Sequence, residues 1–251
     1  MEIIDCTIRD GGYVNNWKFS KKQVSELYDS LNSAGVDYME IGFRREKKES
    51  ELSKFGEWYF CDESLLNETI IEKKKCKIAV MAQLDTFEID NFIYKKDSKI
   101  DMIRILMAYH GFNKKTDDQI DVKLLDKGVE QMKELRKMGY ELSFNIGRID
   151  KLSDEQIDFI CKKISEVDLK NFYMADTYGS LDIFSTKKYV ELFKYLLEEK
   201  YKTNIKVGFH AHNNFQNATP KTLYALQCGA SSIDGTVLGF GRGSGNASTE
   251  L

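Results

Sequence analysis

The segment Glu2–Gly12, with the sequence EIIDCTIRDGG, decides the fold. It begins with a short apolar run, Glu2–Cys6, and continues at once into the polar residues of the Arg9-Asp10-Gly11-Gly12 motif. A short apolar run without clean polar alternation is typical of a parallel strand buried on both faces. Polar residues directly after such a strand belong to the loop at its carboxyl end. The segment therefore predicts a parallel sheet whose strand ends carry polar side chains.

The same pattern recurs along the chain, with amphipathic stretches between the apolar runs. The other predicted strands are Tyr38–Ile41, Cys76–Met81, Met102–Leu106, Glu141–Asn145, Asn171–Ala175, Ile205–Phe209 and Ser232–Val237. Eight strands, each followed by a helix, indicate a TIM (β/α)₈ barrel, and about 250 residues is the usual size of one. A doubly wound open sheet is the alternative. We read residues 1–251 as a single barrel domain, because no linker or internal repeat is visible.

Helix signals support this alternation. Ser20 and Ser153 are predicted N-caps, the second with a capping box, and Thr116 or Asp117 is predicted to start a longer helix. Further signals are Ser185 before an apolar periodicity, Pro220 in a first helical turn, and Gly35, Gly139 and Gly229 at helix ends.

The eighth helix is missing from this pattern. The sequence reaches Leu251 where that helix should begin, so we expect it to be absent or truncated. Strands eight and one would then be uncovered on their outer face, and an uncovered apolar face usually becomes an interface. A homodimer or a longer native chain is expected on this ground.

Composition excludes several classes of protein. The formal net charge of -3, without a basic stripe, argues against a nucleic-acid partner. The five cysteines are odd in number and form no Cys-x-x-Cys pair, which indicates reduced thiols and a cytoplasmic location. No run approaches the roughly 18 apolar residues of a membrane helix. We therefore expect a soluble protein.

Candidate metal ligands lie at strand ends. His210 and His212 are two residues apart, so both imidazoles should point to the same side of a strand. Asp10 supplies a carboxylate, and its neighbouring glycines should allow a sharp turn that aims it inward. Two nitrogens and one carboxylate would leave coordination positions open, as a catalytic divalent metal requires. The alternative is that the histidines only satisfy hydrogen bonds at the barrel mouth.

Arg9 precedes Asp10 and carries a permanent charge. Such a fixed cation could stabilise an enolate or oxyanion on the substrate. It could also form an ion pair with Glu40 or Asp5 that holds the barrel mouth together.

Asn246 closes the glycine-rich stretch Gly239–Asn246, which could cradle an anion or place the Asn246 carbonyl on the metal. A flexible turn is the alternative reading. Other polar residues predicted at strand ends are Gln83, Asn145, Asp176 and Thr177.

Tyr13 is a weaker candidate for proton transfer, since a phenol with a pKa near 10 needs help from a metal or an arginine to act as a base. Tyr178 is expected to pack, and His110 to be a loop residue.

Together these motifs resemble the metal-dependent lyase and aldolase superfamily that includes hydroxymethylglutaryl-CoA lyase and 4-hydroxy-2-oxovalerate aldolase. The resemblance runs from Asp5 to Asn246. It implies a TIM barrel with a divalent metal held by Asp10, His210 and His212, and in some branches by Asn246. It also implies that Arg9 stabilises an enolate, that Glu40 accompanies it, and that Thr177 supplies a substrate-binding hydroxyl.

Within that superfamily the closing glycine-rich loop is similar to the aldolases. The loop lacks the catalytic cysteine of the acyl-CoA lyases, and Gly12 stands where condensing synthases usually have Glu. Two departures from the aldolases are Tyr13, in the place of a base histidine, and the lack of their C-terminal helical region.

The sequence thus predicts a lyase that uses Mn²⁺ or Mg²⁺ to cleave a small 4-hydroxy-2-oxo acid into pyruvate and an aldehyde. Tyr13 or a metal-activated water would accept the 4-hydroxyl proton. The alternatives are a Claisen condensation of acetyl-CoA with a 2-oxo acid, and a barrel that binds a metabolite without turnover.

Overall fold

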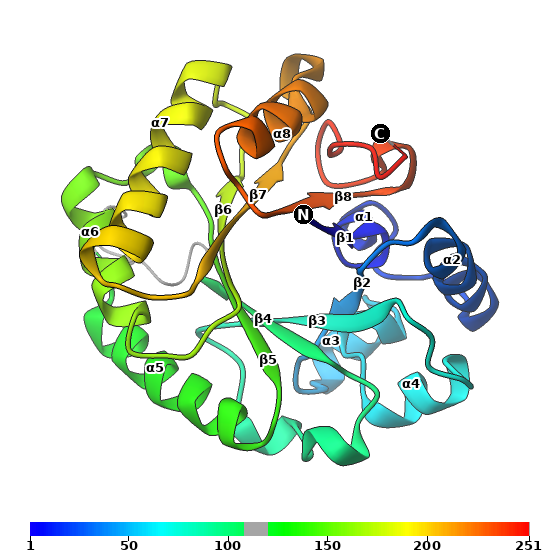
Figure 1. Cartoon of the computed structure of the whole chain (residues 1–251). Coiled ribbons are helices and arrows are strands. Elements are labelled where there is room, and N and C mark those ends of the chain that lie inside the picture. The colour runs from blue at the N-terminus through cyan, green and yellow to red at the C-terminus, as the bar shows by residue number, and fades with distance from the viewer. Residues whose placement is uncertain (108–119, 251) are drawn as a thin grey trace.

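A computed structural model describes residues 1–107 and 120–250. Its eight strands form a closed barrel in which each strand pairs in parallel with the next and β8 pairs with β1 (Figure 1). The strands are β1 (Glu2–Asp5), β2 (Tyr38–Phe43), β3 (Lys77–Gln83), β4 (Met102–Met107), β5 (Glu141–Ile146), β6 (Asn171–Asp176), β7 (Lys206–Ala211) and β8 (Ser232–Gly235). The predicted TIM barrel is confirmed, and the open sheet is wrong.

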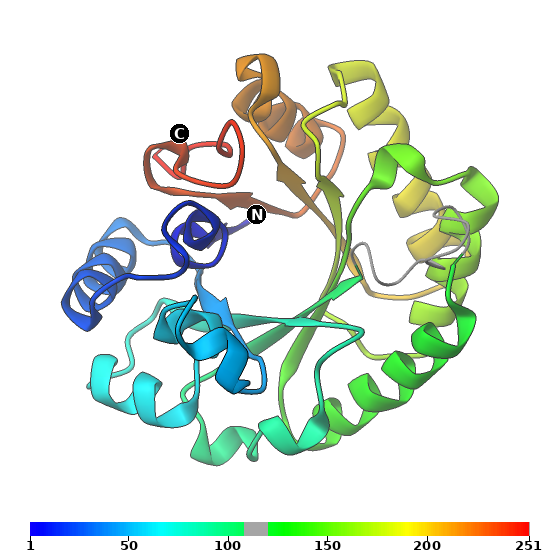
Figure 2. The same cartoon turned by 180° about the vertical axis from the view of Figure 1, so that it is seen from behind.

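Helices surround the barrel in both axial views (Figures 1 and 2). They are α1 (Thr7–Asn15), α2 (Lys21–Ala34), α3 (Glu49–Leu52), α4 (Glu63–Thr69), α5 (Val122–Lys137), α6 (Asp154–Ile164), α7 (Ile183–Lys194) and α8 (Ala218–Gln227). One helix per strand was expected, but between β3 and β4 the chain forms only the 3₁₀ turns Ile89–Asn91 and Lys95–Asp97. No helix of the described residues is long and apolar enough to cross a membrane.

Several helix ends form as their residues predict. Ser20 and Ser153 both make capping boxes, and Gly35 ends α2 in the left-handed conformation with φ of 81°. Pro220 lies in the first turn of α8. The start predicted for α5 is wrong, since that helix begins at Val122, capped by Asp121. Thr116 and Asp117 themselves lie outside the described residues. In α7 the cap is Asp182, three residues before Ser185.

No α-helix follows β8 within the described residues, and the outer faces of β8 and β1 are covered at their carboxyl ends. Thr236 bridges to Ser248, and the Thr249 hydroxyl donates a 2.7 Å hydrogen bond to Asp5. A Cβ on Gly235 would lie 2.8 Å from the Thr249 hydroxyl. The expectation of an uncovered apolar face is therefore wrong at these ends, where the segment 246–250 folds back over the strands, whereas Ile3 and Ile233 stay partly exposed.

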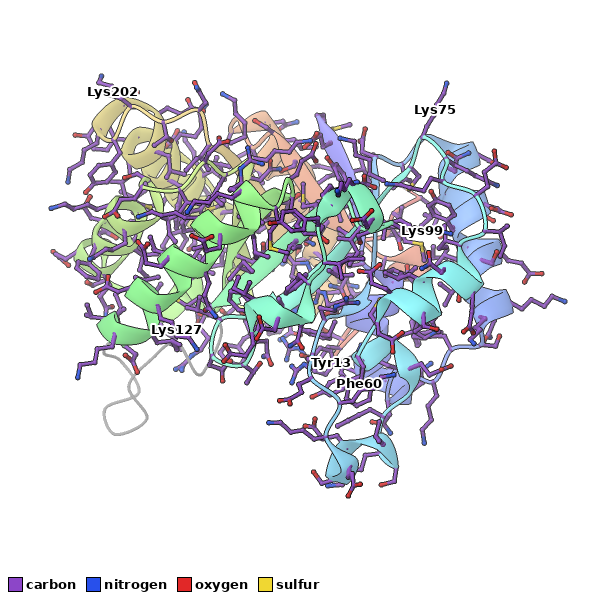
Figure 3. All side chains as sticks on the ribbon, turned by 90° about the horizontal axis from the view of Figure 1, so that it is seen from below. Tyr13, Phe60, Lys75, Lys99, Lys127 and Lys202 are labelled. Carbon is purple, nitrogen blue, oxygen red and sulfur yellow. The ribbon has the colours of Figure 1, made fainter. Side chains whose placement is uncertain are left out.

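Alternate residues of each strand point into the barrel, and one small interior cluster consists of Ile4, Cys6, Tyr38, Ala79, Met102 and Tyr173. Figure 3 shows the barrel from the side. Tyr13, which follows β1, lies at the opposite end from Lys75 and Lys202, which precede β3 and β7. The loops at the carboxyl ends of the strands therefore form one face, where enzymes of this fold place their sites.

Candidate metal centre and active site

The Arg9-Asp10-Gly11-Gly12 motif lies inside helix α1, so the sharp turn predicted for it is wrong. Its glycines serve close packing instead. A Cβ on Gly11 would lie 2.5 Å from the Phe240 ring, and a Cβ on Gly12 would lie 2.1 Å from the Trp17 indole. These two glycines let α1 press against the loop after β8 and against Trp17, which brings Asp10 to the barrel mouth.

Asp10, His210 and His212 come together at this mouth. One ligand atom from each lies within 4.8 Å of the others, and all three side chains are buried. His210 and His212 both point into the mouth from β7 and its end, with ring centroids 5.1 Å apart. The arrangement follows directly from the two-residue period of a strand.

Asn246 completes this cluster. Its Nδ2 lies 3.2 Å from Nε2 of His210, while its buried Oδ1 has no hydrogen-bond partner among the described residues. A Cβ on Gly241 would lie 1.8 Å from that Oδ1 and 2.7 Å from Oδ2 of Asp10. A glycine is thus required where the loop closes over two candidate ligand atoms.

The ring nitrogens of the two histidines are oriented for metal binding. Nδ1 of His210 donates to Oδ2 of Asp234 at 2.9 Å, and Nδ1 of His212 donates to the Gly245 carbonyl at 3.2 Å. These bonds leave a lone pair on each Nε2, as is usual for histidine ligands with second-sphere partners. Burial, aided by the neighbouring His210, lowers the pKa of His212 to about 3, so the ring is neutral at physiological pH.

Asp10 is the charged member of the set. Although burial opposes its ionisation, the Arg9 guanidinium holds the pKa of Asp10 well below its usual range. Two imidazoles, one carboxylate and one amide oxygen without a partner among the described residues form the donor set that a hard divalent cation accepts. The residues present therefore fit a divalent metal.

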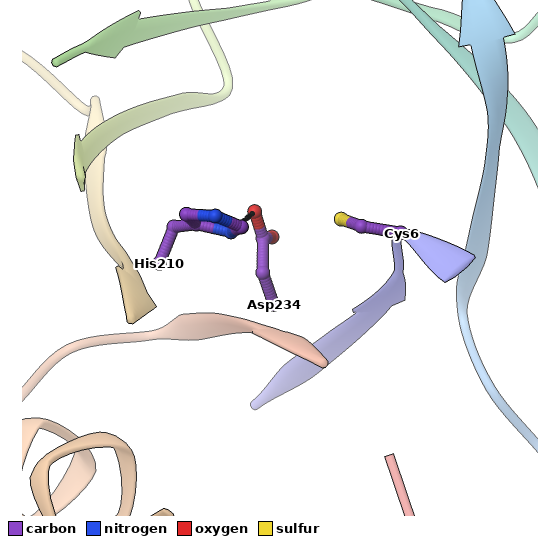
Figure 4. Close-up of side chains that lie close together, drawn as sticks. All are labelled: Cys6, His210 and Asp234. Carbon is purple, nitrogen blue, oxygen red and sulfur yellow. Dashed lines mark hydrogen bonds and ion pairs between the residues drawn. The ribbon is translucent and has the colours of Figure 1, made fainter. Parts of the chain in front are cut away.

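A second cluster, Cys6, His210 and Asp234, also has the composition of a metal site. Figure 4 shows the three side chains converging from β7, β8 and the end of β1. However, Arg104 donates two hydrogen bonds to Asp234, of 2.8 and 3.0 Å, and lies 3.5 Å from the Cys6 sulfur. Burial raises the pKa of the Cys6 thiol, which therefore stays protonated. This cluster supports His210 from behind and is unsuited to a cation of its own.

Arg104 joins the two halves of the site. Nη1 of Arg104 lies 3.0 Å from Glu40, and Glu40 accepts a 2.6 Å hydrogen bond from Nε of Arg9. On its other side Arg104 holds Asp234, which in turn orients His210. Its guanidinium also lies 4.3 Å from the Tyr173 ring centre. The predicted Arg9–Glu40 ion pair is thus part of a longer buried chain of charges, whereas Asp5 bonds Thr7 and Thr249.

These groups line a pocket of about 120 Å³. Its wall contains Arg9, Asp10, Tyr13, Met81, Gln83, Leu106, Asn145, Gly147, Ala175, Thr177, His210, His212 and Arg242. This volume is small beside the 300–1,000 Å³ typical of pockets for drug-sized molecules. The pocket suits a substrate of a few carbon atoms.

Of three weaker candidates, two line the pocket and one lies outside it. The Thr177 hydroxyl lies on the pocket wall and accepts a 2.8 Å hydrogen bond from the Arg148 amide. Tyr13 also lines the pocket, and desolvation, opposed by Arg9, raises the pKa of its phenol above the ordinary value. Asp176, in contrast, turns away and forms a fully buried ion pair with Lys221.

Tyr178 lines an adjoining pocket of about 170 Å³ and is 38% exposed, so the expectation that it packs is wrong. His110 lies outside the described residues.

Sequence reasoning missed Arg104, Asp234 and Arg242. A signal was present for the first two, because each is a charged residue inside an apolar strand, where an unpaired charge would be very costly. Arg242 lies in the glycine-rich stretch Gly239–Asn246, for which only Asn246 and the backbone were given a role. Its backbone amide donates to Asp10 at 3.1 Å, and its guanidinium lies 3.1 Å from Nε2 of His212.

The fold and the site define a TIM barrel with a buried cluster of one carboxylate and two histidines, able to hold a metal, beside a paired arginine. A family model described as HMGL-like matches residues 1–251. The chain belongs to the HMGL-like family, and the predicted resemblance is confirmed.

Curated relatives match the whole chain at modest identity. A 4-hydroxy-2-oxovalerate aldolase of Pelotomaculum thermopropionicum is 29% identical over 251 residues, covering 100% of this chain and 68% of that protein. An oxaloacetate decarboxylase of Mycobacterium tuberculosis is 25% identical over 255 residues, covering 99% of this chain and 67% of that protein.

Solved structures agree on the fold. The N-terminal domain of a putative aldolase from Bacteroides vulgatus superposes with a TM-score of 0.81 and 26% identity, covering 100% of this chain and 77% of that one. The HMG-CoA lyase of Bacillus subtilis gives a TM-score of 0.75 at 18% identity, covering 99% and 83%.

Proposed function

We propose that this protein is a divalent-metal-dependent carbon–carbon lyase that cleaves a small 4-hydroxy-2-oxo acid into pyruvate and an aldehyde. The observation that carries the proposal is the convergence of Asp10, His210 and His212 beside the paired Arg9 in one small pocket. The names of the aldolase relatives support the reaction class. Asp10, His210, His212 and Asn246 would hold the metal, which would supply Lewis-acid polarisation of the 2-oxo group.

Arg9 stabilises the negative charge that develops on the enolate oxygen. Its Nε is fixed by Glu40 and its Nη1 by Asp10, both at 2.6 Å. Nη2 donates to none of the described residues and is left for a substrate oxygen. A cation that is already oriented in a buried site needs no reorganisation during the reaction, which is why such groups are effective.

Tyr13 faces the 4-hydroxyl end of the substrate in this proposal. Because its pKa is raised, the phenol keeps its own proton at neutral pH. It would take up the 4-hydroxyl proton while passing its own proton to solvent, to which Tyr13 is 41% exposed. Thr177 and Asn145 also line the pocket and would bind substrate oxygens. The ligand set suits Mn²⁺ or Mg²⁺, with the two imidazoles favouring Mn²⁺.

Calorimetric binding of oxalate, a stable mimic of pyruvate enolate, tests the proposal. Metal-stripped and manganese-loaded protein are titrated alongside the His210→Ala variant and an Asp182→Asn control, which changes an exposed helix cap only. We expect binding by the manganese-loaded wild type and control, and none by His210→Ala or the stripped protein. Equal oxalate affinity of the metal-stripped and manganese-loaded proteins would overturn the assigned site.

Turnover is tested with 4-hydroxy-2-oxopentanoate and a pyruvate assay. Release of coenzyme A from acetyl-CoA and a 2-oxo acid would instead select the Claisen reaction. Metal-dependent oxalate binding without any product would select a binding barrel. The homodimer expected from sequence is tested by light scattering of the same preparation.

A further inference from the structure

Arg242 is a second cation in the pocket wall and differs from Arg9 in its ion pairing. Arg9 is shared between two carboxylates, Asp10 and Glu40. The guanidinium of Arg242 pairs with no carboxylate of residues 1–107 or 120–250. Its partners are neutral, namely the Thr177 carbonyl and Nε2 of His212. A half-buried guanidinium without a counter-ion can bind an anionic group of a ligand.

A metal bound to Nε2 of His212 would replace the hydrogen bond that this nitrogen accepts from Arg242. Nε2 of a neutral imidazole has a single lone pair, so donation from Arg242 and a bond to a cation are alternatives. A metal held by His212 would therefore free the guanidinium of Arg242 for another partner in the pocket. Its Nε and Nη1 donate to none of the described residues either.

Arg242 lies where the main pocket continues into a second pocket. It lines both the main pocket and the adjoining pocket of about 170 Å³, whose other walls are Thr177, Tyr178, His212, Asn214, Gly243 and Ser244. Apart from Gly243 and part of Tyr178, these residues carry hydrogen-bonding side chains. An apolar alkyl group on the leaving aldehyde would offer the guanidinium neither a charge partner nor a hydrogen-bond acceptor there.

We propose that Arg242 binds a second carboxylate at the distal end of the substrate, so that the enzyme acts on 4-hydroxy-2-oxo dicarboxylic acids. The inference rests on the proposed function and narrows its substrate class. For 4-hydroxy-2-oxoglutarate, the C4 hydroxyl gives its proton to solvent through Tyr13 and the C3–C4 bond breaks. The electron pair passes to C3 as the enolate, C4 becomes the carbonyl of glyoxylate, and C3 takes up a proton to give pyruvate.

Binding of two unreactive ligands tests the role of Arg242. 2-Oxoglutarate and 2-oxopentanoate have five carbons each and differ in a terminal carboxylate against a methyl group. Both are titrated calorimetrically into the manganese-loaded wild type, Arg242→Met, Arg242→Lys and an Arg136→Met control on the distant helix α5. A charge-assisted pair in a half-buried site predicts a roughly 10- to 100-fold preference of the wild type for 2-oxoglutarate.

We expect Arg242→Met to lose this preference while its affinity for 2-oxopentanoate stays near the wild-type value. Arg242→Lys should keep part of the preference, and the control all of it. Without a competitor for His212, Arg242→Met should also bind Mn²⁺ several-fold more tightly. The ratio of kcat/KM for 4-hydroxy-2-oxoglutarate over 4-hydroxy-2-oxopentanoate should follow the same order.

The failures are distinguishable. Equal affinity of the wild type for the two ligands, with oxalate still bound, would overturn the dicarboxylate inference and leave the lyase standing. A preference that survives in Arg242→Met would show that another group binds the carboxylate. Loss of oxalate binding in the wild type would overturn the proposed function itself.

Discussion

His210 donates from Nδ1 to Oδ2 of Asp234 across 2.9 Å, so a carboxylate inside the barrel sets which histidine nitrogen faces the pocket. Asp234 stands on β8 and His210 on β7, and the two strands are hydrogen-bonded neighbours. The carboxylate itself is fixed by Arg104, and despite burial this guanidinium helps to lower the pKa of Asp234 to about 2. The orientation of one proposed metal ligand therefore depends on a pair that lies outside the pocket lining.

Asp234→Asn should weaken metal binding. The amide cannot stabilise the Nδ1–H tautomer as a carboxylate does, and loss of such second-sphere partners typically costs about 10- to 100-fold in affinity. Calorimetric titration with Mn²⁺ measures this, with Asp182→Asn as the same substitution at an exposed helix cap. An unchanged dissociation constant in Asp234→Asn would rule out the orienting role.

Arg104→Met should be strongly destabilising. It would leave Glu40 and Asp234 in a fully buried site without their shared counter-ion, and removing one partner of a buried pair costs about 3–5 kcal/mol. Arg136→Met, which breaks an ion pair with an exposed Asp168, should cost less than about 1 kcal/mol. Urea unfolding at pH 7 compares the unfolding free energies of the two variants. Similar losses of stability would contradict the role of Arg104 as the shared counter-ion of Glu40 and Asp234.

Gly12→Ala should destabilise the protein, against the usual trend for a helix. Alanine in place of glycine normally stabilises a helix interior by roughly 0.5–1 kcal/mol. Here the new Cβ would lie 2.1 Å from the Trp17 indole, and such overpacking costs about 1–3 kcal/mol. The sign of the change in unfolding free energy decides the matter, and a gain in stability would show that α1 is not pressed against Trp17.

Asp5→Asn should remove a pH dependence of stability. Burial raises the pKa of Asp5 to about 6, although hydrogen bonds from Thr249 and Thr7 oppose the shift. The folded protein therefore binds the proton more tightly than the unfolded chain, whose value is 3.8. The resulting stability is full below pH 4 and is lost as the pH rises through about 6.

The shift corresponds to at most about 3 kcal/mol. The unfolding free energy of the wild type minus that of Asp5→Asn, measured from pH 4 to 7.5, should fall by up to that amount as the pH rises. A difference between the two proteins that stays constant with pH would contradict the raised pKa.

Much of the fold was readable from local sequence. The eight apolar runs fall on the eight strands to within two residues at every end, because strands buried on both faces need continuous apolar residues. Ser20, Ser153 and Gly35 marked helix ends correctly, since capping is a local hydrogen-bonding effect. The missing helix after β3 could not be foreseen, because nothing local requires a crossover to be helical.

The sequence by itself determined the ligand types and their faces. His210 and His212 share a face through the strand period, and Asp10 follows its strand whatever the loop conformation. Only the tertiary structure decided that Arg104 joins Glu40 to Asp234, and that Arg242 meets His212. These contacts join segments up to 130 residues apart. Barrel closure, which pairs β8 with β1, brings them together, and no local preference encodes that distance.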